Sequence, residues 1–248
     1  LALDAAAVGE SYNVAIGLAA MTSVDEGSSG TADYNVAVGY NALEGGDFST
    51  SSTDLIGNIA IGANAMDSTG TNAQTGTIAI GHSALTALTS GAGNTAIGYT
   101  AMASETDGYY STAVGYLSLN ALTGIGGTAG NTTVGSGTGK LLVTGTYNTV
   151  MGFNAYDAAD GSESHNMAIG VDALGNLNDN GATRNIAIGN YAGDGMSTLA
   201  SLDNIFVGYD AGGGTWTGTL SSYNVGIGNY VMDAAMNAAT YNTAIGHI

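Results

Sequence analysis

The chain of 248 residues has no cysteine, no proline and only two basic residues, Lys140 and Arg184, against twenty acidic ones. The absence of cysteine excludes a disulfide framework and a thiolate metal site. A formal net charge of −18 excludes binding to nucleic acid or to an anionic membrane surface, because both require clustered positive charge. No apolar segment approaches the ~18 residues of a membrane span, so we expect no membrane insertion.

Charged residues make up only 9% of the chain, whereas glycine contributes 41 residues. An ordinary globular domain has about a quarter charged residues, so Ser, Thr, Asn and Gly must solvate most of this surface. The acidic groups favour solubility of an elongated particle, and they also supply oxygen ligands suited to Ca²⁺. This composition favours a repetitive protein over a globular enzyme.

One motif, Asn-x-Ala-Ile/Val-Gly-x-x-Ala-Leu/Met, recurs along the chain, for example as NVAIGLAAM from Asn13 and NTAIGYTAM from Asn94. Its glycine occurs thirteen times with a mean spacing of about 19 residues, at Gly17, Gly39, Gly62, Gly81, Gly98, Gly115, Gly135, Gly152, Gly170, Gly189, Gly208, Gly228 and Gly246. Its asparagine is present in eleven copies, at Asn13, Asn35, Asn58, Asn94, Asn131, Asn148, Asn166, Asn185, Asn204, Asn224 and Asn242. Recurrence of one motif at this spacing indicates a tandem repeat.

The second and fourth motif residues are mostly β-branched, and the third is mostly alanine. This period of two predicts one short strand per copy, with the second and fourth side chains on one face and the third on the other. Threonines share the second position with Val and Ile, and we expect them to face inward, at Thr95, Thr112, Thr132 and Thr149.

So short a strand cannot bury itself, but stacked copies share a continuous core. The sequence therefore predicts an all-β fold, a parallel β-solenoid of about 13 coils that spans residues 1–248 as one repeat array, without evident capping repeats. Coils spaced by ~4.8 Å give a rod of about 60 Å.

The run Val-Ala-Ile-Gly-x-x-Ala, with Asn before it and small residues after it, resembles the head repeats of trimeric autotransporter adhesins and related repeats in bacteriophage tail fibres. The resemblance covers nearly the whole chain, although the coils here are longer than the compact head repeats. It implies a left-handed parallel β-roll, trimeric, displayed on a cell or virion surface, with binding on the outside of the rod.

Two sets of motif residues are candidates for structural or binding roles. The asparagines are expected to stack as an internal ladder in which each amide bonds the next coil, and the motif glycines, among them Gly17, Gly39, Gly62 and Gly98, belong to the same structural repeat. Tyrosines flank the motif, and those after the glycine are the candidates for surface recognition of a sugar or a partner, at Tyr40, Tyr99, Tyr116 and Tyr209. Stacking along a structural ladder is the alternative reading of these tyrosines.

Acidic residues gather between the motifs, at Asp25, Glu26, Asp33, Glu44, Asp47, Asp54, Glu105, Asp107, Asp157, Asp160 and Glu163. Of these, Asp157, Asp160 and Glu163 are the weak candidates for a Ca²⁺ site. The run that begins at Asn176 imitates a calcium loop, but its twelfth residue is Ala187 instead of Glu. The three histidines lack metal-ligand spacing and no carboxylate pair stands out, so we expect no cofactor and no enzyme activity.

The two ends of the chain fit the repeat. Joining Ile248 to Leu1 places the last and first motif glycines 19 residues apart, which predicts head-to-tail stacking of subunits. A start at Leu1 indicates a processed form or a stretch of a longer protein.

We therefore interpret the chain as an extracellular structural fibre protein, at the cell surface or on a virion, whose partner is itself. The alternative is a segment of a trimeric adhesin or phage tail fibre that binds a cell-surface glycan or receptor. Ice binding by aligned threonines is a further alternative.

Overall fold

The computed structural model describes residues 12–24, 30–45, 53–70, 72–196, 201–216 and 220–247. The chain is an all-β parallel β-solenoid with a period near 19 residues, which confirms the fold predicted from the motif. It forms two compact units, Leu1–Ala129 and Gly130–Ile248, and each is described by itself. The described residues contain no helix that could cross a membrane.

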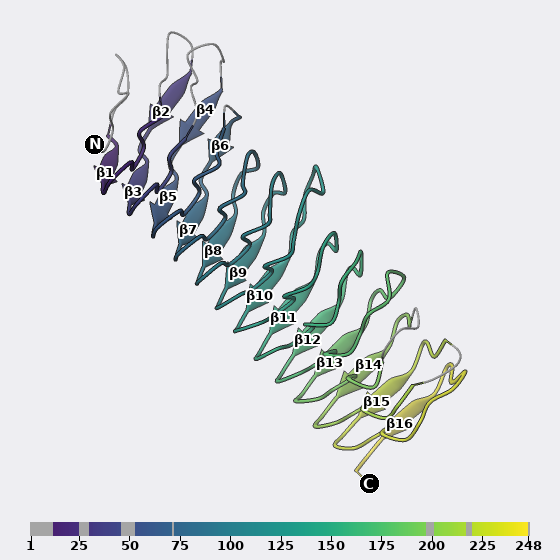
Figure 1. Ribbon diagram of the computed structural model, residues 1–248. Helices are drawn as coiled ribbons and strands as arrows, with labels where there is room; N and C mark the ends of the chain where they lie inside the picture. The colour runs from purple at the N-terminus through teal and green to yellow at the C-terminus, as the bar shows by residue number, and fades with distance from the viewer. Residues whose placement is uncertain are drawn as a thin grey trace. The chain divides into compact units, whose positions relative to one another are not determined.

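In the first unit, six short strands pair in parallel, each with the strand of the next coil (Figure 1). The motif positions lie opposite their equivalents, so that Val14 pairs with Val36 and Ala15 with Ala37. These strands are β1 (Val14–Ile16), β3 (Val36–Val38), β5 (Ile59–Ile61), β7 (Ile78–Ile80), β8 (Thr95–Ile97) and β9 (Thr112–Val114). The register keeps every motif residue in a row of identical positions.

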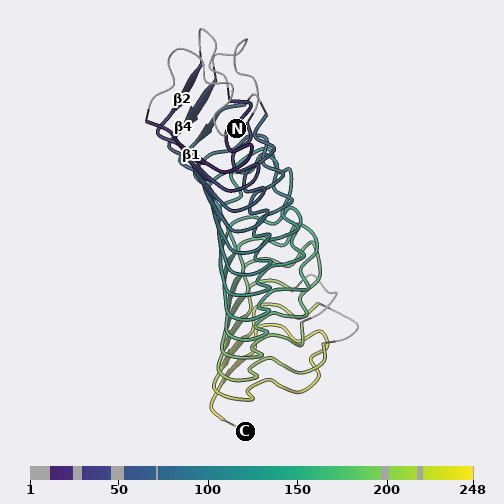
Figure 2. The ribbon, with the colours of Figure 1, turned by 60° about the vertical axis from the view of Figure 1, so that its left-hand side comes forward.

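A second parallel sheet belongs to the first coils of this unit. It consists of β2 (Thr31–Asp33), β4 (Asp54–Ile56) and β6 (Gln74–Thr75), in that order. Figure 2 shows β2 and β4 side by side above these coils. The motif did not predict these strands, because their residues lie outside it.

The second unit contains seven strands, each again paired in parallel with the strand of the next coil. Motif positions again lie opposite each other, for example Ile186 and Ile205. These strands are β10 (Thr132–Val134), β11 (Thr149–Met151), β12 (Met167–Ile169), β13 (Ile186–Ile188), β14 (Ile205–Val207), β15 (Val225–Ile227) and β16 (Thr243–Ile245).

The core of each coil is narrow and is built mainly from small residues. The third motif residue, in the middle of the strand, is usually a buried alanine, and the Ala-Leu/Met pair after the motif glycine fills the rest, as Ala101 and Met102 do. Phe206 replaces the alanine in β14, and the glycines Gly212 and Gly226 make room for its ring, since a Cβ at either would lie within 3.1 Å of the Phe206 ring. Volume is therefore conserved between neighbouring coils.

Each coil also holds residues in the left-handed backbone region. The residue before the first motif residue, which is usually asparagine, has φ between 56° (Asp203) and 68° (Gly93) in every described coil. A left-handed residue with a side chain costs about 1–2 kcal/mol, and hydrogen bonds to the neighbouring coil hold it there, such as Tyr223 N–H to Leu202 C=O at 2.9 Å. β-Branched residues are absent from this position, as their stiffness requires.

Candidate functional site

The second and fourth motif residues, which are the first and last residues of the thirteen motif strands, form a surface that we call the outer strand face. The third motif residue, in the middle of the strand, points inward and is buried in all strands but β1 and β16, whereas its neighbours are partly or fully exposed, as the pattern of exposed, buried, exposed in β11 shows. The expectation that Thr95, Thr112, Thr132 and Thr149 face inward is therefore wrong. They lie on the outer strand face, because the third motif residue, mostly alanine, takes up the narrow interior.

The motif asparagines line the interior of each unit as a hydrogen-bonded ladder. The Asn185 side chain is buried; its Oδ1 accepts from the backbone N–H and from Nδ2 of Asn204, each at 3.1 Å. Its Nδ2 donates to the carbonyl of Ser201 at 2.8 Å. Similar bonds join Asn13 to Asn35 and Asn35 to Asn58 in the first unit. The amides thus satisfy backbone groups of the turn and of the next coil, a structural role.

The left-handed residues before the asparagines form an exposed row, which we call the pre-asparagine row. Tyr12 and Tyr34 stack at 4.9 Å and 4°, and Tyr223 and Tyr241 stack at 4.9 Å and 3°. Elsewhere in this row the Arg184 guanidinium donates two hydrogen bonds to Asp203, at 2.7 and 2.8 Å. The row is a set of side chains that pair between adjacent coils.

The four tyrosines singled out for surface recognition are all exposed, between 40% (Tyr209) and 54% (Tyr116). Tyr99 and Tyr116 stack at 5.5 Å, and His82 stacks on Tyr99 at 5.3 Å. Tyr40 lies on the same side of its coil as the others, directly after a motif glycine. The structure thus brings Tyr99 and Tyr116 together and adds His82.

A second aromatic cluster surrounds Tyr209 in the second unit. Tyr191 and Tyr230 contact its ring edge-on, at centroid distances of 5.7 and 5.4 Å. Sequence reasoning missed both residues, because they stand two positions after their motif glycines whereas Tyr209 stands one position after. The available signal was that neighbouring coils bring these two positions next to each other.

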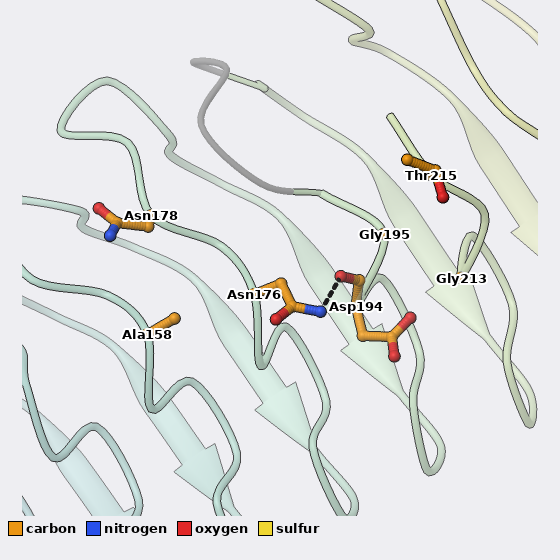
Figure 3. Close-up of a pocket in the computed structure, with 7 residues that line it drawn as sticks. All are labelled: Ala158, Asn176, Asn178, Asp194, Gly195, Gly213 and Thr215. Carbon is orange, nitrogen blue, oxygen red and sulfur yellow. Dashed lines mark hydrogen bonds between the residues drawn. The ribbon is translucent and has the colours of Figure 1, made fainter. Parts of the chain in front are cut away.

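A polar groove adjoins this cluster, which we call the Asp194 groove. One part, of about 380 Å³, is lined by Ala158, Asn176, Asn178, Asp194, Gly195, Gly213 and Thr215 (Figure 3). A second part, of about 340 Å³, shares Asn176 and Asp194 and adds Asp157, Asp172, Gly175 and Tyr191. Asn176 points toward Asp194 and donates to its backbone carbonyl at 2.9 Å. The groove therefore combines carboxylates, amides and one aromatic ring.

Burial and nearby negative charges raise the pKa of two carboxyl groups in this groove, those of Asp194 and Asp157. Partial burial, followed by the nearby Asp210 and Asp172 carboxylates, raises the pKa of Asp194 to about 6. Asp194 and Asp210 each place Oδ1 within 3.1 Å of the point that a Cβ on Gly213 would occupy. Burial also raises the pKa of Asp157, with Lys140 opposing and Asp172 adding to the shift. The groove is thus a site where folding favours protonated carboxyl groups.

This arrangement predicts a pH-dependent stability that Asp194→Asn removes. The pKa of Asp194 is higher in the folded chain than its ordinary 3.8. Protonation of Asp194 therefore stabilises the folded chain. This stabilisation is complete below pH ~4 and is lost as the pH rises through about 6. Because Asp194 is half-exposed, solvent screening reduces the effect to about 1 kcal/mol. We expect Asp194→Asn to raise the free energy of unfolding by this amount at pH 8, and to change it little at pH 4, in urea titrations.

The control for that experiment is Asp160→Asn, which removes one exposed negative charge outside the groove. Equal gains for the two variants at pH 8 would indicate a general net-charge effect. A gain for Asp194→Asn that is the same at pH 4 and pH 8 would contradict the assignment of the proton to Asp194.

The acidic candidates for Ca²⁺ are dispersed. Asp160 is exposed, Asp157 lines the Asp194 groove, and Glu163 is buried, where its Oε2 accepts from the Gly161 N–H at 3.0 Å. Burial raises the pKa of Glu163. Glu105 is likewise turned into its own loop and accepts three backbone N–H bonds.

The remaining acidic candidates add no site. Among the described residues, no group of three or more His, Asp or Glu side chains is arranged to hold a metal ion. Asp25, Glu26 and Asp47 lie outside the described residues. His82, His165 and His247 each contact a tyrosine ring of an adjacent coil.

The last described coil carries an apolar pocket of about 210 Å³. It is lined by Val231, Met232, Ala244, Ile245, Gly246 and His247. Ala244 occupies the third motif position, which is buried in the inner coils of the unit, as at Ala187. The pocket therefore lies over the core position of the last described coil.

Comparison with family models, with curated proteins and with solved structures finds no match for this chain.

Proposed function

We propose that this chain is an extracellular structural fibre protein whose subunits stack end to end into a surface filament. A β-solenoid fold is compatible with a fibrous or adhesin-like role. The observation that carries the proposal is the complementarity of the two edge strands: among the described residues, β1 pairs only with β3, and β16 pairs only with β15. Open strand edges are templates for pairing with another chain.

The backbone groups of the two edges fit each other. In both units, the N–H of the second motif residue donates to the carbonyl of the first motif residue of the following coil, as Val225 does to Asn242 at 2.8 Å. The motif glycine N–H donates to the preceding coil, as Gly39 does to Ile16 at 2.8 Å. By the same rule, Thr243 N–H of one subunit faces Asn13 C=O of the next, and Gly17 N–H faces Ile245 C=O.

The side chains of the two ends also match. Asn13 begins the ladder and Asn242 ends it, so the Oδ1 of Asn242 is placed to accept from Asn13 of the next subunit, as Asn224 accepts from Asn242 at 3.1 Å. Tyr241 and Tyr12 are exposed by 77% and 75%, and both already stack on one neighbour. Joining the ends extends these two pairs into one stack of four rings and covers the pocket at Ala244.

The substitution Thr243→Pro tests this proposal. Proline removes an N–H that faces the next subunit, and Thr243 is on an edge, where the fold itself tolerates proline. We expect wild type to form fibres that lengthen with concentration in negative-stain electron microscopy, and the variant to shorten the mean fibre length at least tenfold. Circular dichroism and urea titration verify that the variant stays folded.

The matched control is Thr243→Val, which keeps the N–H and the β-branched shape, and which should form fibres like wild type. Fibres of unchanged length from a folded Thr243→Pro variant would sink the end-to-end proposal. Discrete short rods or trimers of wild type at every concentration would favour the second candidate function.

That second function is a segment of a trimeric adhesin or phage tail fibre that binds a cell-surface glycan or receptor. The observation in its favour is the cluster of Tyr191, Tyr209 and Tyr230 beside the Asp194 groove. Sugar rings pack on aromatic faces, while carboxylates and amides accept and donate hydrogen bonds to hydroxyl groups. The proposal assigns no catalytic residue, no metal and no cofactor.

A further inference from the structure

The outer strand face is an exposed apolar surface in both units. The second and fourth motif positions hold Val, Ile, Met or Thr in every copy, and none holds an ionisable residue. In the second unit Met151, Ile188 and Ile227 are exposed by 49%, 37% and 39%, and in the first unit Ile61 is exposed by 37%. An extended apolar surface on a water-soluble protein marks a site of interaction.

The charge of the chain limits which partner can cover this face. Twenty acidic residues and two basic ones leave the rest of the surface strongly negative, so two copies repel each other over most of their surface. The outer strand face carries no charge, and it is where two copies can approach without repulsion between carboxylates. It also repeats once per coil in exact parallel register, as the pairs Ile186–Ile205 and Ile188–Val207 illustrate.

We propose that the outer strand face is a lateral interface at which a second copy of this chain packs sheet against sheet. A second copy presents the same uncharged residues at the same coil spacing, so the ridges of one sheet fit between those of the other along successive coils. Packed sheets lie about 10 Å apart, with interdigitated side chains. The interface is distinct from the end-to-end contact, because it uses strand side chains and not strand edges.

The composition of the face favours a protein copy over ice. Threonine occupies the second motif position in five of the thirteen copies, and the fourth motif position is always Ile, Val or Met. A surface so rich in branched aliphatic side chains gains most from removal of water by another apolar surface. We therefore expect self-association through this face. Ice binding by a protein that does not self-associate would contradict this expectation.

The test measures self-association of the full chain in the Thr243→Pro background, which blocks the ends. We expect sedimentation equilibrium to give at least twice the 24.4 kDa mass of one chain. The triple substitution Ile61→Lys, Ile188→Lys and Ile227→Lys places ammonium groups in the interface, where an unpaired buried charge is strongly unfavourable, and should raise the dissociation constant about 100-fold or more. Particle width in electron micrographs reports the same pairing whether or not the ends are blocked.

The control is the triple substitution Ala73→Lys, Leu141→Lys and Leu220→Lys, which adds the same charge at exposed positions off the outer strand face. Added lysines reduce the net negative charge, so a non-specific effect would strengthen association in both variants. Weakening only in the outer-face variant supports the inference. A monomeric Thr243→Pro protein of single-rod width, equal behaviour of the two lysine variants, or thermal hysteresis from a monomer would each overturn it, while fibre length separately reports the end-to-end proposal.

Discussion

Gly98→Ala is expected to lower the free energy of unfolding by about 4 kcal/mol, through steric overlap and a strained backbone. A Cβ added at Gly98 would overlap the carbonyl oxygen of Gly115 and lie 2.6 Å from its carbonyl carbon. Both are backbone atoms of the next coil, so the overlap is relieved only by separating β8 from β9. Gly98 also has φ of 141°, a region that side chains disfavour. Urea unfolding followed by circular dichroism measures the loss, and hydrogen exchange of β8 and β9 locates it.

Gly76→Ala is the matched control for that experiment. Gly76 has φ of 65°, but a Cβ there would meet no atom within 4 Å. Only the left-handed backbone then opposes alanine, at a cost of about 1 kcal/mol. A similar loss for the two variants would show that backbone conformation, and not the close approach of adjacent coils, makes the motif glycine necessary.

The motif was sufficient to predict the strands, because each copy repeats the same evidence. β8, for example, covers Thr95–Ile97, the second to fourth residues of its motif. Alternation alone did not determine which face of the strand lies inside, since a period of two is the same for both orientations. The distinguishing signal was size: the third position holds alanine with few exceptions, and where Phe206 replaces it, Gly226 stands opposite in the next coil.

The second sheet and the Asp194 groove could not be read from the motif. β2, β4 and β6 have unrelated sequences and pair only because their coils are held in register by the first sheet. The groove depends on turn geometry, because Asp194 stands five residues after its motif glycine and Asp210 only two. Adjacent coils bring these two aspartates together although they stand at different distances from their motif glycines. The spacing of the motif therefore does not predict their proximity.

Asn185→Leu is expected to cost about 4 kcal/mol of unfolding free energy, because buried polar groups would lose their partners. Leucine has the same number and branching of side-chain heavy atoms but leaves the Ser201 carbonyl without the amide that donates to it at 2.8 Å. It also leaves the Asn204 backbone N–H without the Oδ1 that accepts from it at 3.1 Å. Neither group has access to water, since Ser201 and Asn204 are buried. The midpoint of urea unfolding reports the loss.

Asn190→Leu makes the same change in the same coil on an exposed residue. The Asn190 Oδ1 accepts from the Val171 N–H at 3.0 Å, but this bond lies at the surface, where water replaces the lost acceptor. We therefore expect a loss of no more than about 1 kcal/mol. If the two variants unfold at the same urea concentration, the ladder does not act by satisfying buried backbone groups. If only Asn185→Leu is destabilised, burial of the amide explains why the motif keeps asparagine where an aliphatic residue would bury more apolar surface.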